Sequence, residues 1–227
     1  MSTEQAATEA APDTGRKQQQ RSIVTQQKLL DAAIQAFSEN GFKGTSTRDI
    51  ADRAGVHHPL ITYHFKNKTR LWRAAADKIF REFNISLVKA MAEVEDVDPR
   101  TRAETFIRTY VYYAHKQPAL HKMILQESSY PSERLDWLVE NHLRPLYVMV
   151  EPSLQRLQEM GVAPAGDTGL LYNMIRVSAG GLLALSLEIR GTTDIDLELD
   201  EDLEQLADMI VRVFLPGDKP NPAPTGD

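Results

Sequence analysis

Basic, hydroxyl and aromatic side chains gather in one short stretch of the chain, STRDIADRAGVHHPLITYHFKNK, which runs from Ser46 to Lys68. Side chains of these types donate hydrogen bonds to phosphate oxygens and reach the edges of bases. Arg48 is the strongest candidate for a base contact, because an arginine fork can donate to O6 and N7 of guanine together. Outside such a motif, an arginine would more often be an ordinary surface residue. The chemistry that this stretch favours is therefore recognition of duplex DNA.

Two short helices joined by a turn are predicted to position these side chains. Ser46 and Thr47 can cap a helix over residues 47–54, because their hydroxyls accept hydrogen bonds from the free N–H groups of the first turn. Gly55 can adopt the left-handed conformation that ends a helix. Apolar residues then recur through a second helix that ends near Phe65. Two such helices form a helix-turn-helix unit, whose second helix enters the major groove of DNA.

No motif for catalysis accompanies this unit. The chain has no cysteine, no HExxH and no Gly-x-Ser-x-Gly sequence. His115 and His121 are six residues apart, which is a poor spacing for two ligands of one metal on a single helix. We therefore expect no enzymatic activity, no cofactor and no metal site, although His and Glu residues that converge in space leave metal sensing open.

The composition is that of an ordinary globular chain, with 227 residues of which 42% are hydrophobic and 26% are charged. No apolar run approaches the ~20 residues that cross a bilayer. The N-terminus lacks the basic start and apolar core of a secretory signal, and the absence of cysteine fits a reducing compartment. These features predict a cytoplasmic protein with no membrane partner.

Charge is divided unevenly along the chain. Residues 16–70 carry ten Lys or Arg and four Asp or Glu, a net charge of +6, whereas the whole chain carries −6. The remainder therefore carries −12. A basic module on an acidic body suits a protein in which one part meets phosphates, although a solvated charged face would give the same pattern.

Hydrophobic periodicity predicts helices and no strands, so the expected fold class is all-α. Residues 1–22 lack this periodicity and are expected to form a disordered arm. A DNA-binding domain over residues 23–70 would begin with a helix from Thr25 to Asn40. Residues 71–215 would form a second domain, and the proline-rich residues 216–227 a disordered tail.

A long helix from about Lys68 to Met91 should connect the two domains, because apolar residues recur along it at steps of four. Pro145 and Pro152 should bend the longest of the later helices. Asp167 or Thr168 should cap the helix before the last, and Asp200 should cap the last one. These later helices are expected over residues 100–116, 118–128, 131–160, 168–190 and 200–215.

The segment from about Thr25 to Leu71 resembles the DNA-binding domain of the TetR family of bacterial transcriptional regulators. The resemblance rests on GFKGTSTRDIADRAGVHHPLITYHFKNKTRL. In this sequence a Gly-aromatic start, a Thr/Ser cluster, Ile-Ala, Ala-Gly-Val, an aromatic-His-Phe ending and a following Lys fall at the family's spacing. About fifty residues carry the match. It implies an N-terminal three-helix helix-turn-helix domain, followed by a C-terminal helical domain that binds a ligand and dimerises.

The resemblance also implies which residues contact DNA. Two departures from the family pattern concern the second helix. His57 stands where a Ser or Thr cap is usual, and Thr62 stands where a Tyr is common. These departures leave the operator sequence open but do not change the expected docking mode. The residues implied to face DNA are Thr47, Arg48, His57, His58, Leu60, Thr62, Tyr63, His64 and Lys68.

A homodimer built from the last two long helices of each subunit is a further implication. Small residues at 178–181 allow backbones to approach closely, and the leucines around them would expose an apolar surface in a monomer. A purely intramolecular core would explain the same residues. Two-fold symmetry would require a palindromic operator. The residues predicted for the dimer interface are Ser178, Gly181, Leu182, Leu185, Leu203, Leu206 and Ile210.

The family resemblance also implies an effector pocket inside the second domain. Polar or adaptable side chains on otherwise apolar helical faces are the natural candidates for its lining. Each of them would more often be an ordinary core residue. The candidates are Tyr110, Tyr113, Glu127, His142, Met149 and Met174.

Together these patterns predict a ligand-responsive transcriptional regulator, most simply a repressor, that binds a palindromic operator in double-stranded DNA as a homodimer. No motif identifies its small-molecule effector, its regulated genes or the direction of the ligand's effect. Two alternatives stay open. One is a helical small-molecule-binding or adaptor protein in which the helix-turn-helix is structural, and the other is a nucleoid-type DNA binder without an effector.

Overall fold

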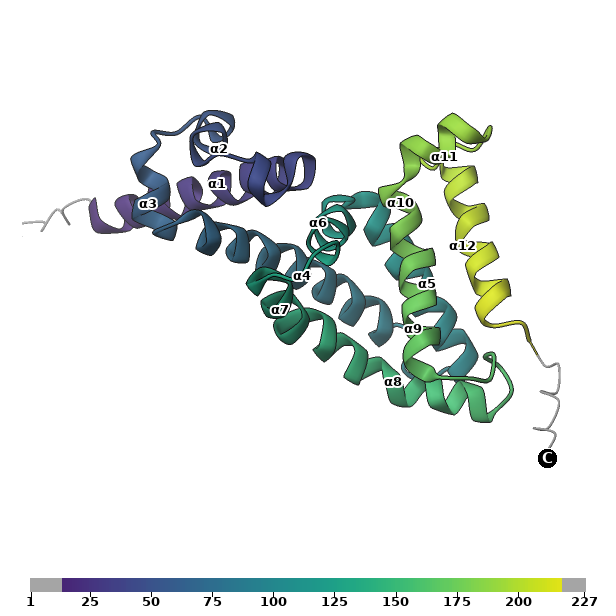
Figure 1. The fold of residues 1–227 in the computed structure, drawn as a ribbon. Helices are drawn as coiled ribbons and strands as arrows, with labels where there is room; N and C mark the ends of the chain where they lie inside the picture. Colours follow the sequence, from purple (N-terminus) through teal and green to yellow (C-terminus); the bar gives the residue numbers. More distant parts are fainter. Residues whose placement is uncertain (1–13, 218–227) are drawn as a thin grey trace, which may run out of the picture.

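Helices provide all the regular structure between residues 14 and 217, the part of the chain that the computed structural model describes. No strand occurs in that range, so the all-α prediction is confirmed. Three helices at the N-terminal end form one group. The long helix α4 (Lys68–Ala92) leads from them into a larger second group (Figure 1).

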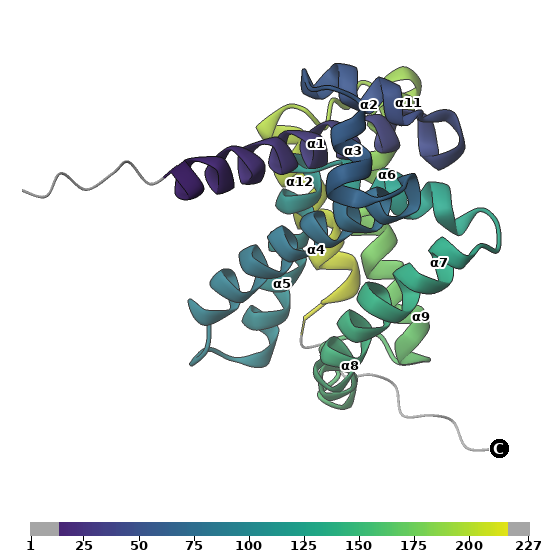
Figure 2. The ribbon, with the colours of Figure 1, turned by 90° about the vertical axis from the view of Figure 1, so that its left-hand side faces the viewer.

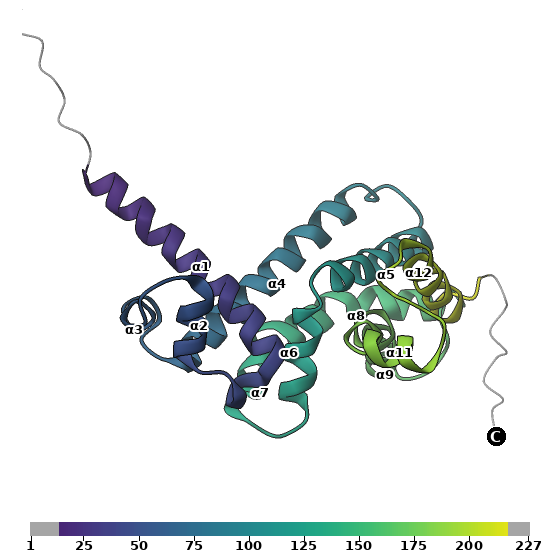
Figure 3. The same cartoon turned by 90° about the horizontal axis from the view of Figure 1, so that it is seen from above.

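The first helix, α1 (Thr14–Gly44), begins well before the predicted start at Thr25. The expectation of a disordered arm over residues 1–22 is therefore wrong from residue 14 onward, while residues 1–13 lie outside the described range. The run RKQQQR consists of good helix formers, and it extends a helix that the buried Leu29 anchors further on. This extension projects away from the other helices (Figures 2 and 3). At Gly41 (φ 68°) the backbone leaves the helical conformation, as predicted.

The helices α2 (Thr47–Ala54) and α3 (Pro59–Phe65) complete the N-terminal group. Both are too short to be stable alone, so their stability comes from packing. Ile50 and Ala51 of α2 and Ile61 and Phe65 of α3 are buried in the core that α1 and α4 share. The predicted boundaries of α2 are confirmed.

The long helix α4 starts directly after α3 and continues into the second group. Asn67 caps it, since its Oδ1 accepts a hydrogen bond from the Arg70 N–H at 2.9 Å. Its 25 residues span about 37 Å at the usual rise per residue. The predicted stripe is confirmed, because each of its members is buried. These members are Leu71, Ala75, Ile79, Phe83 and Leu87.

The second group packs around the far part of α4. Asp98 and Asp167 cap two of its helices through their side chains, as predicted for Asp167. Arg108 ties the group together across a long sequence separation, since it forms ion pairs with Glu204 at 2.9 Å and Asp208 at 2.5 Å. Its helices are α5 (Pro99–Lys116), α6 (Ala119–Ser128), α7 (Glu133–Leu138), α8 (Arg144–Glu159), α9 (Thr168–Arg176), α10 (Leu182–Ala184), α11 (Ser186–Thr192) and α12 (Asp200–Phe214).

Two of the predicted long helices are interrupted. A π-helical turn, Val139–Leu143, separates α7 from α8 directly before Pro145, whose missing N–H and ring disturb the preceding turn. A second π turn, Val177–Gly181, follows α9. Beyond it the chain bends by 76° at Leu185, so the straight helix expected over residues 168–190 is wrong.

The last helix, α12, begins without the predicted cap. Leu199 occupies the cap position and makes no side-chain hydrogen bond, so the prediction that Asp200 caps this helix is wrong. Asp200, Glu201 and Asp202 all lie in the first turn instead. Their charges favour the positive end of the helix dipole, which replaces the stabilisation that a cap would give.

No single helix within residues 14–217 meets both criteria for crossing a membrane, sufficient length and sufficient apolar composition. One bent pair, Thr168–Ala184 with Ser186–Thr192, meets them only when its two parts are taken together.

Candidate nucleic-acid interface and ligand cavity

Specific residues determine where helix α2 begins and where it ends. Ser46 Oγ accepts a hydrogen bond from the Asp49 N–H at 3.0 Å, and Gly55 ends the helix in the left-handed conformation (φ 65°, ψ 37°). The Val56 N–H then donates to the Ala51 carbonyl at 3.0 Å. The predicted cap and the predicted stop are both confirmed, and they set the turn that leads to α3.

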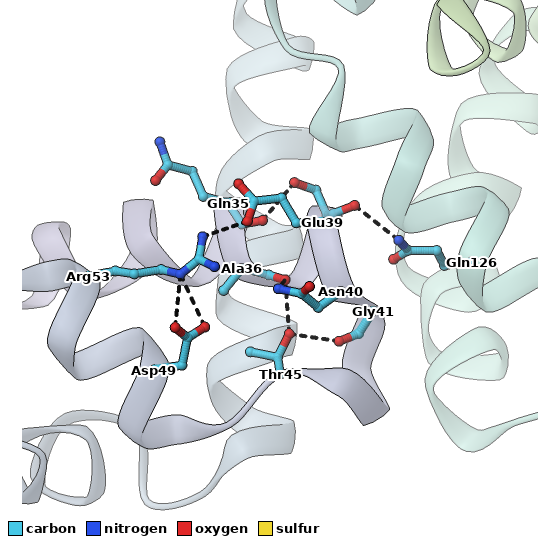
Figure 4. A network of polar contacts seen from close by, with 10 residues as sticks. Gln35, Ala36, Glu39, Asn40, Gly41, Thr45, Asp49, Arg53 and Gln126 are labelled. Atoms are coloured by element: carbon cyan, nitrogen blue, oxygen red, sulfur yellow. Dashed lines mark hydrogen bonds and ion pairs between the residues drawn. The ribbon is translucent and has the colours of Figure 1, made fainter. Parts of the chain in front are cut away.

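A polar network holds α2 against α1 (Figure 4). Arg53 donates to Glu39 of α1 at 2.6 Å and to Asp49 of its own helix at 3.1 Å. Nearby, the buried Thr45 hydroxyl lies 2.9 Å from the carbonyl oxygen of Ala36. These contacts fix the angle between the two helices, and they occupy the Arg53 side chain, which is therefore a poor candidate for a DNA contact.

Five of the predicted DNA contacts, including His58, are open to solvent. Arg48, on the first turn of α2, is exposed and makes no hydrogen bond or ion pair with any residue between 14 and 217. His57, Thr62 and Tyr63 are exposed as well, and the Tyr63 side chain reaches 75% exposure. An unpaired guanidinium and accessible hydroxyls are the groups that base and phosphate contacts require.

Residue His58, rather than His57, occupies the cap position of α3, and it makes no capping hydrogen bond through its side chain. The prediction of His57 at this cap is therefore wrong by one residue, because Pro59 takes the first helical position. The His58 Nε2 atom instead lies 2.9 Å from Thr47 Oγ1. This hydrogen bond joins the starts of α2 and α3, so Thr47 and His58 position each other.

Three other predicted contacts are partly withdrawn from solvent. Leu60 is half-buried against the core, so its place among the DNA-facing residues is not supported. His64 is half-buried, and this burial lowers its pKa. Lys68 Nζ lies 4.5 Å from the centre of the Phe42 ring. Burial and the nearby Arg134 lower the pKa of Lys68. Lys68 therefore helps to join the two groups of helices, whatever it contributes to DNA binding.

A further basic residue, Lys66, was not singled out from the sequence. It is exposed and directly follows α3. It is also the one non-glycine residue of the described range with a positive φ, at 67°, where glycine or asparagine is usual. The signal in the sequence was the basic run Lys-Asn-Lys after the aromatic-His-Phe ending. Lys66 is therefore an additional candidate for a phosphate contact.

The second group of helices encloses a cavity of about 430 Å³ between α4, α5, α8 and α9. Small-molecule sites typically occupy roughly 300–1,000 Å³. Of the six pocket residues predicted from the sequence, Tyr110 and Met149 line this cavity. Other lining residues include Leu87, Met91, Arg102, Phe106, Tyr172 and Arg176.

Three of the predicted pocket residues lie elsewhere. The Tyr113 hydroxyl donates to the Ile79 carbonyl at 2.9 Å, which explains its burial. Glu127 is buried and paired with Arg134 at 2.9 Å. Met174 is exposed on α9. None of the three lines the cavity. Tyr113 and Glu127 therefore match the other interpretation of these candidates, that they are ordinary core residues.

The sixth predicted pocket residue, His142, borders a separate and more open depression. Its ring stacks on Phe80 with 4.3 Å between the ring centres, and its Nε2 atom lies 2.9 Å from Asp77 Oδ1. Burial lowers the pKa of His142, while Asp77 opposes this shift. His142 therefore has the contacts of a satisfied structural histidine.

The predicted dimer residues are not all on the surface. Gly181, Leu203 and Ile210 are buried within the chain's own core, so the expectation of an exposed face at these positions is wrong. Ser178, Leu182 and Leu206 are half-buried, and Leu185 is exposed. The other large apolar side chains exposed on α9 to α12 include Leu170, Met174, Val177, Leu187, Met209 and Val213.

A helix-turn-helix unit with exposed basic and hydroxyl side chains, continued by one long helix into a larger helical domain, is the architecture of an all-helical protein with a DNA-binding domain. The sequence model of the bacterial regulatory proteins of the tetR family matches residues 29–75. These residues form a DNA-binding domain of the TetR family, as the resemblance implied.

Relatives with known names are similar to this chain at low identity. The regulator RutR of Escherichia coli is 23% identical over 94% of this chain and 99% of RutR. IcaR of Staphylococcus epidermidis, a negative transcriptional regulator of the biofilm operon icaADBC, is 25% identical over 56% of this chain and 65% of IcaR. The chain spans about half the length of the first curated relatives that it matches.

A solved structure with the same fold is that of HlyIIR, a hemolysin II transcriptional regulator. Its TM-score is 0.65 at 18% identity, over 86% of this chain and 98% of HlyIIR. This likeness confirms the arrangement of an N-terminal helix-turn-helix domain and a C-terminal helical domain.

Proposed function

We propose that this protein is a ligand-responsive transcriptional repressor that binds a palindromic operator as a homodimer. The observation that carries the proposal is the course of α4. This helix begins at Lys68, directly after the exposed DNA-facing helix α3, and its far end supplies Leu87 and Met91 to the cavity wall. A ligand that shifts the far end of α4 would therefore move the helix-turn-helix unit.

A second contact between the two groups of helices supports this coupling. Phe42 follows α1's break at Gly41, and its ring meets two cations, Lys68 at 4.5 Å and Arg134 of α7 at 3.9 Å. Gln126 of α6 donates to a carbonyl of α1 at 3.0 Å (Figure 4). The N-terminal group is thus held by α6 and α7 as well as by α4, so movement inside the second group has two routes to it.

The repressor role is the simplest reading of the relatives, because IcaR is named a negative regulator. The homodimer is supported by the exposed apolar side chains of α9 and α12. Met209 and Val213 are 52% and 57% exposed, and a row of such side chains marks an interaction surface more often than free surface. Each subunit would present one helix-turn-helix unit, so the operator would contain two inverted half-sites.

Selection from a pool of random-sequence DNA tests the proposal. The recovered sequences should share two inverted half-sites, and fluorescence anisotropy should give at least ~10³-fold tighter binding to them than to random DNA. Affinity for both should fall steeply with salt, because phosphate contacts release counterions. Binding without any shared sequence would contradict the operator and would favour a nucleoid-type DNA binder.

The exposed Lys66 allows a test of phosphate contact in the same assay. Lys66→Ala should weaken binding to specific and random DNA alike, and the slope of log affinity against log salt should fall by about one. Lys66→Gly should weaken binding equally, although it relieves the positive φ at this position. Loss of sequence preference in either variant, with the salt slope unchanged, would assign Lys66 to a base instead.

A further inference from the structure

We propose that the cavity of the second domain takes an amphipathic organic anion, with a carboxylate head and an extended apolar body. The inference rests on the proposed function, because it names the class of ligand for that same cavity. It is carried by the division of the cavity into apolar walls and one cationic, hydroxyl-bearing region.

Apolar side chains make up most of the wall. Leu87 and Met91 come from α4, Phe106 and Ile107 from α5, and Leu157 from α8. These groups offer no hydrogen bonds, so they favour a hydrocarbon body of the ligand through the hydrophobic effect alone. Small-molecule sites commonly combine such walls with a few placed polar groups.

The charge of the lining is of one sign. Arg102, Arg156 and Arg176 line the cavity, and no Asp or Glu is among the lining residues that the structure describes. Arg102 is occupied, since it donates to the carbonyls of Val94 and Glu95 at 2.9 and 2.8 Å. Arg156 is exposed. Arg176 is therefore the cation best placed for a ligand.

Arg176 lacks a carboxylate partner within residues 14–217, and its one hydrogen bond runs to Asn173 at 3.3 Å. It is half-buried on α9, close enough for its charge to affect Tyr110, Tyr172 and His121. A cationic ligand would meet this charge without compensation, whereas a carboxylate could accept two parallel hydrogen bonds from the guanidinium.

The Tyr172 hydroxyl is the second, independent observation. Tyr172 is 7% exposed, it lines the cavity, and its hydroxyl has no hydrogen-bond partner in the structure. The hydroxyl oxygen is buried in the free protein, and because buried polar groups are nearly always paired, an orphan hydroxyl on a residue that lines the cavity indicates a missing acceptor. Tyr172 and Arg176 are four residues apart on α9 and therefore lie on the same side of that helix. Together they can hold one carboxylate.

A neutral histidine, His121, forms a hydrogen bond with Tyr110 of the cavity lining. The Tyr110 hydroxyl and His121 Nε2 are 2.9 Å apart. Burial, followed by the charge of Arg176, lowers the pKa of His121 to about 3. The imidazole is thus uncharged near neutral pH and satisfies Tyr110. His121 Nδ1 and the Tyr172 hydroxyl are then the buried polar atoms near Arg176 that have no partner within residues 14–217.

Calorimetric titration of the full chain with three probes of equal tail length tests the ligand class. The probes are dodecanoate and dodecylammonium, each kept below its critical micelle concentration, and dodecanol, kept below its solubility limit. Dodecanoate should bind about tenfold or more tighter than the other two, as expected for hydrogen bonds to a charged group. Equal or tighter binding of dodecylammonium or dodecanol would overturn the inference.

Two substitutions locate the head. Arg176→Gln should weaken dodecanoate binding about tenfold or more and leave dodecanol binding within about twofold, while Arg176→Lys should restore part of the loss. Tyr172→Phe should weaken dodecanoate binding several-fold without lowering Tm, because its hydroxyl is unpaired in the free protein. Arg144→Gln is the matched control, since Arg144 is exposed and outside the cavity lining. Equal losses in all of these variants would contradict the assigned site.

The same titrations, repeated with operator DNA present, separate this inference from the proposed function. If dodecanoate binds at Arg176 but operator affinity is unchanged, the ligand class stands and the ligand-responsive role falls. If another class of compound releases the DNA through the same cavity while dodecanoate does not bind, the ligand-responsive role stands and the anion inference falls.

Discussion

Two arginines of α2 show how burial and partners divide roles between identical side chains. Arg48 is exposed and unpaired within the described range, whereas Arg53 is held between Glu39 and Asp49. Sequence alone could place both arginines on the same short helix, but it could not tell which one is free. That distinction depends on where α1 presents Glu39, which is a property of packing.

Replacing each arginine with alanine should therefore affect a different property, base preference for Arg48 and stability for Arg53. Arg48→Ala should leave stability unchanged and relax base preference at one operator position, a loss of about 1–3 kcal/mol in discrimination. Arg53→Ala should lower the free energy of unfolding slightly, as for other solvent-exposed ion pairs, and retain the base preference. Urea unfolding and binding to single-base operator variants measure the two effects. A loss of base preference in Arg53→Ala would reverse the assignment.

Buried His121 makes stability depend on pH. Its pKa in the folded protein is about 3, below the unfolded value of ~6.5. The unfolded state therefore binds more protons between these values. The contribution of neutral His121 to stability is complete above pH ~6.5 and is lost progressively as pH falls toward 3, up to about 5 kcal/mol in total. Urea unfolding at pH 7, 6 and 5 should show this decline, and His121→Gln should reduce its slope. An unchanged slope in that variant would assign the decline to other groups.

At the level of helices, the sequence predicted most positions but not the interruptions. The caps at Ser46 and Asp167 and the stripe along α4 are local patterns, so periodicity and side-chain chemistry sufficed. The π turn Val177–Gly181 is different, because its Gly180 packs closely against a residue that is distant in the sequence. A Cβ on Gly180 would lie 2.0 Å from His121 Nε2. The small residues at 178–181 thus serve, at least at Gly180, the chain's own core.

Substitution at Gly180 tests this reading. Gly180→Ala should lower the free energy of unfolding by about 1–3 kcal/mol through overpacking, although alanine normally adds ~1 kcal/mol inside a helix. In a His121→Ala background the same change should cost nothing. Gly191→Ala is the control, since open space surrounds that position. An equal cost of Gly180→Ala in both backgrounds would show that His121 is not the obstacle.

For the whole molecule, the proposed dimer surface was the least predictable feature. Leucines at helical spacing were assigned to an exposed face, yet Leu203 is 3% exposed while Met209 and Val213 are open. One helix has an inner and an outer apolar stripe, and periodicity alone cannot say which stripe the protomer uses for its own core. The cavity was equally difficult to predict from the sequence. Its lining comes from α4 and α5 on the one hand and from α8 and α9 on the other, and these two pairs of helices are far apart in the sequence.

The outer apolar stripe of α12, which includes Met209 and Val213, is expected to form the proposed dimer contact. Met209→Glu and Val213→Glu together should convert the proposed dimer to a monomer in analytical ultracentrifugation, because two charges would be buried in an apolar contact. Ile85→Glu is the control, since Ile85 is 63% exposed on α4, away from α9 and α12. If Ile85→Glu alone caused dissociation, the interface would be assigned to α4 instead.

The orphan hydroxyl of Tyr172 also has an evolutionary consequence. A phenylalanine at this position would remove an unpaired buried group and so favour the free protein. Mutational drift should therefore have replaced the tyrosine unless binding of a ligand selects it. Related regulators that carry phenylalanine at the position of Tyr172 should then tend to lack the arginine at the position of Arg176, and a family tree would date the two losses to the same branches.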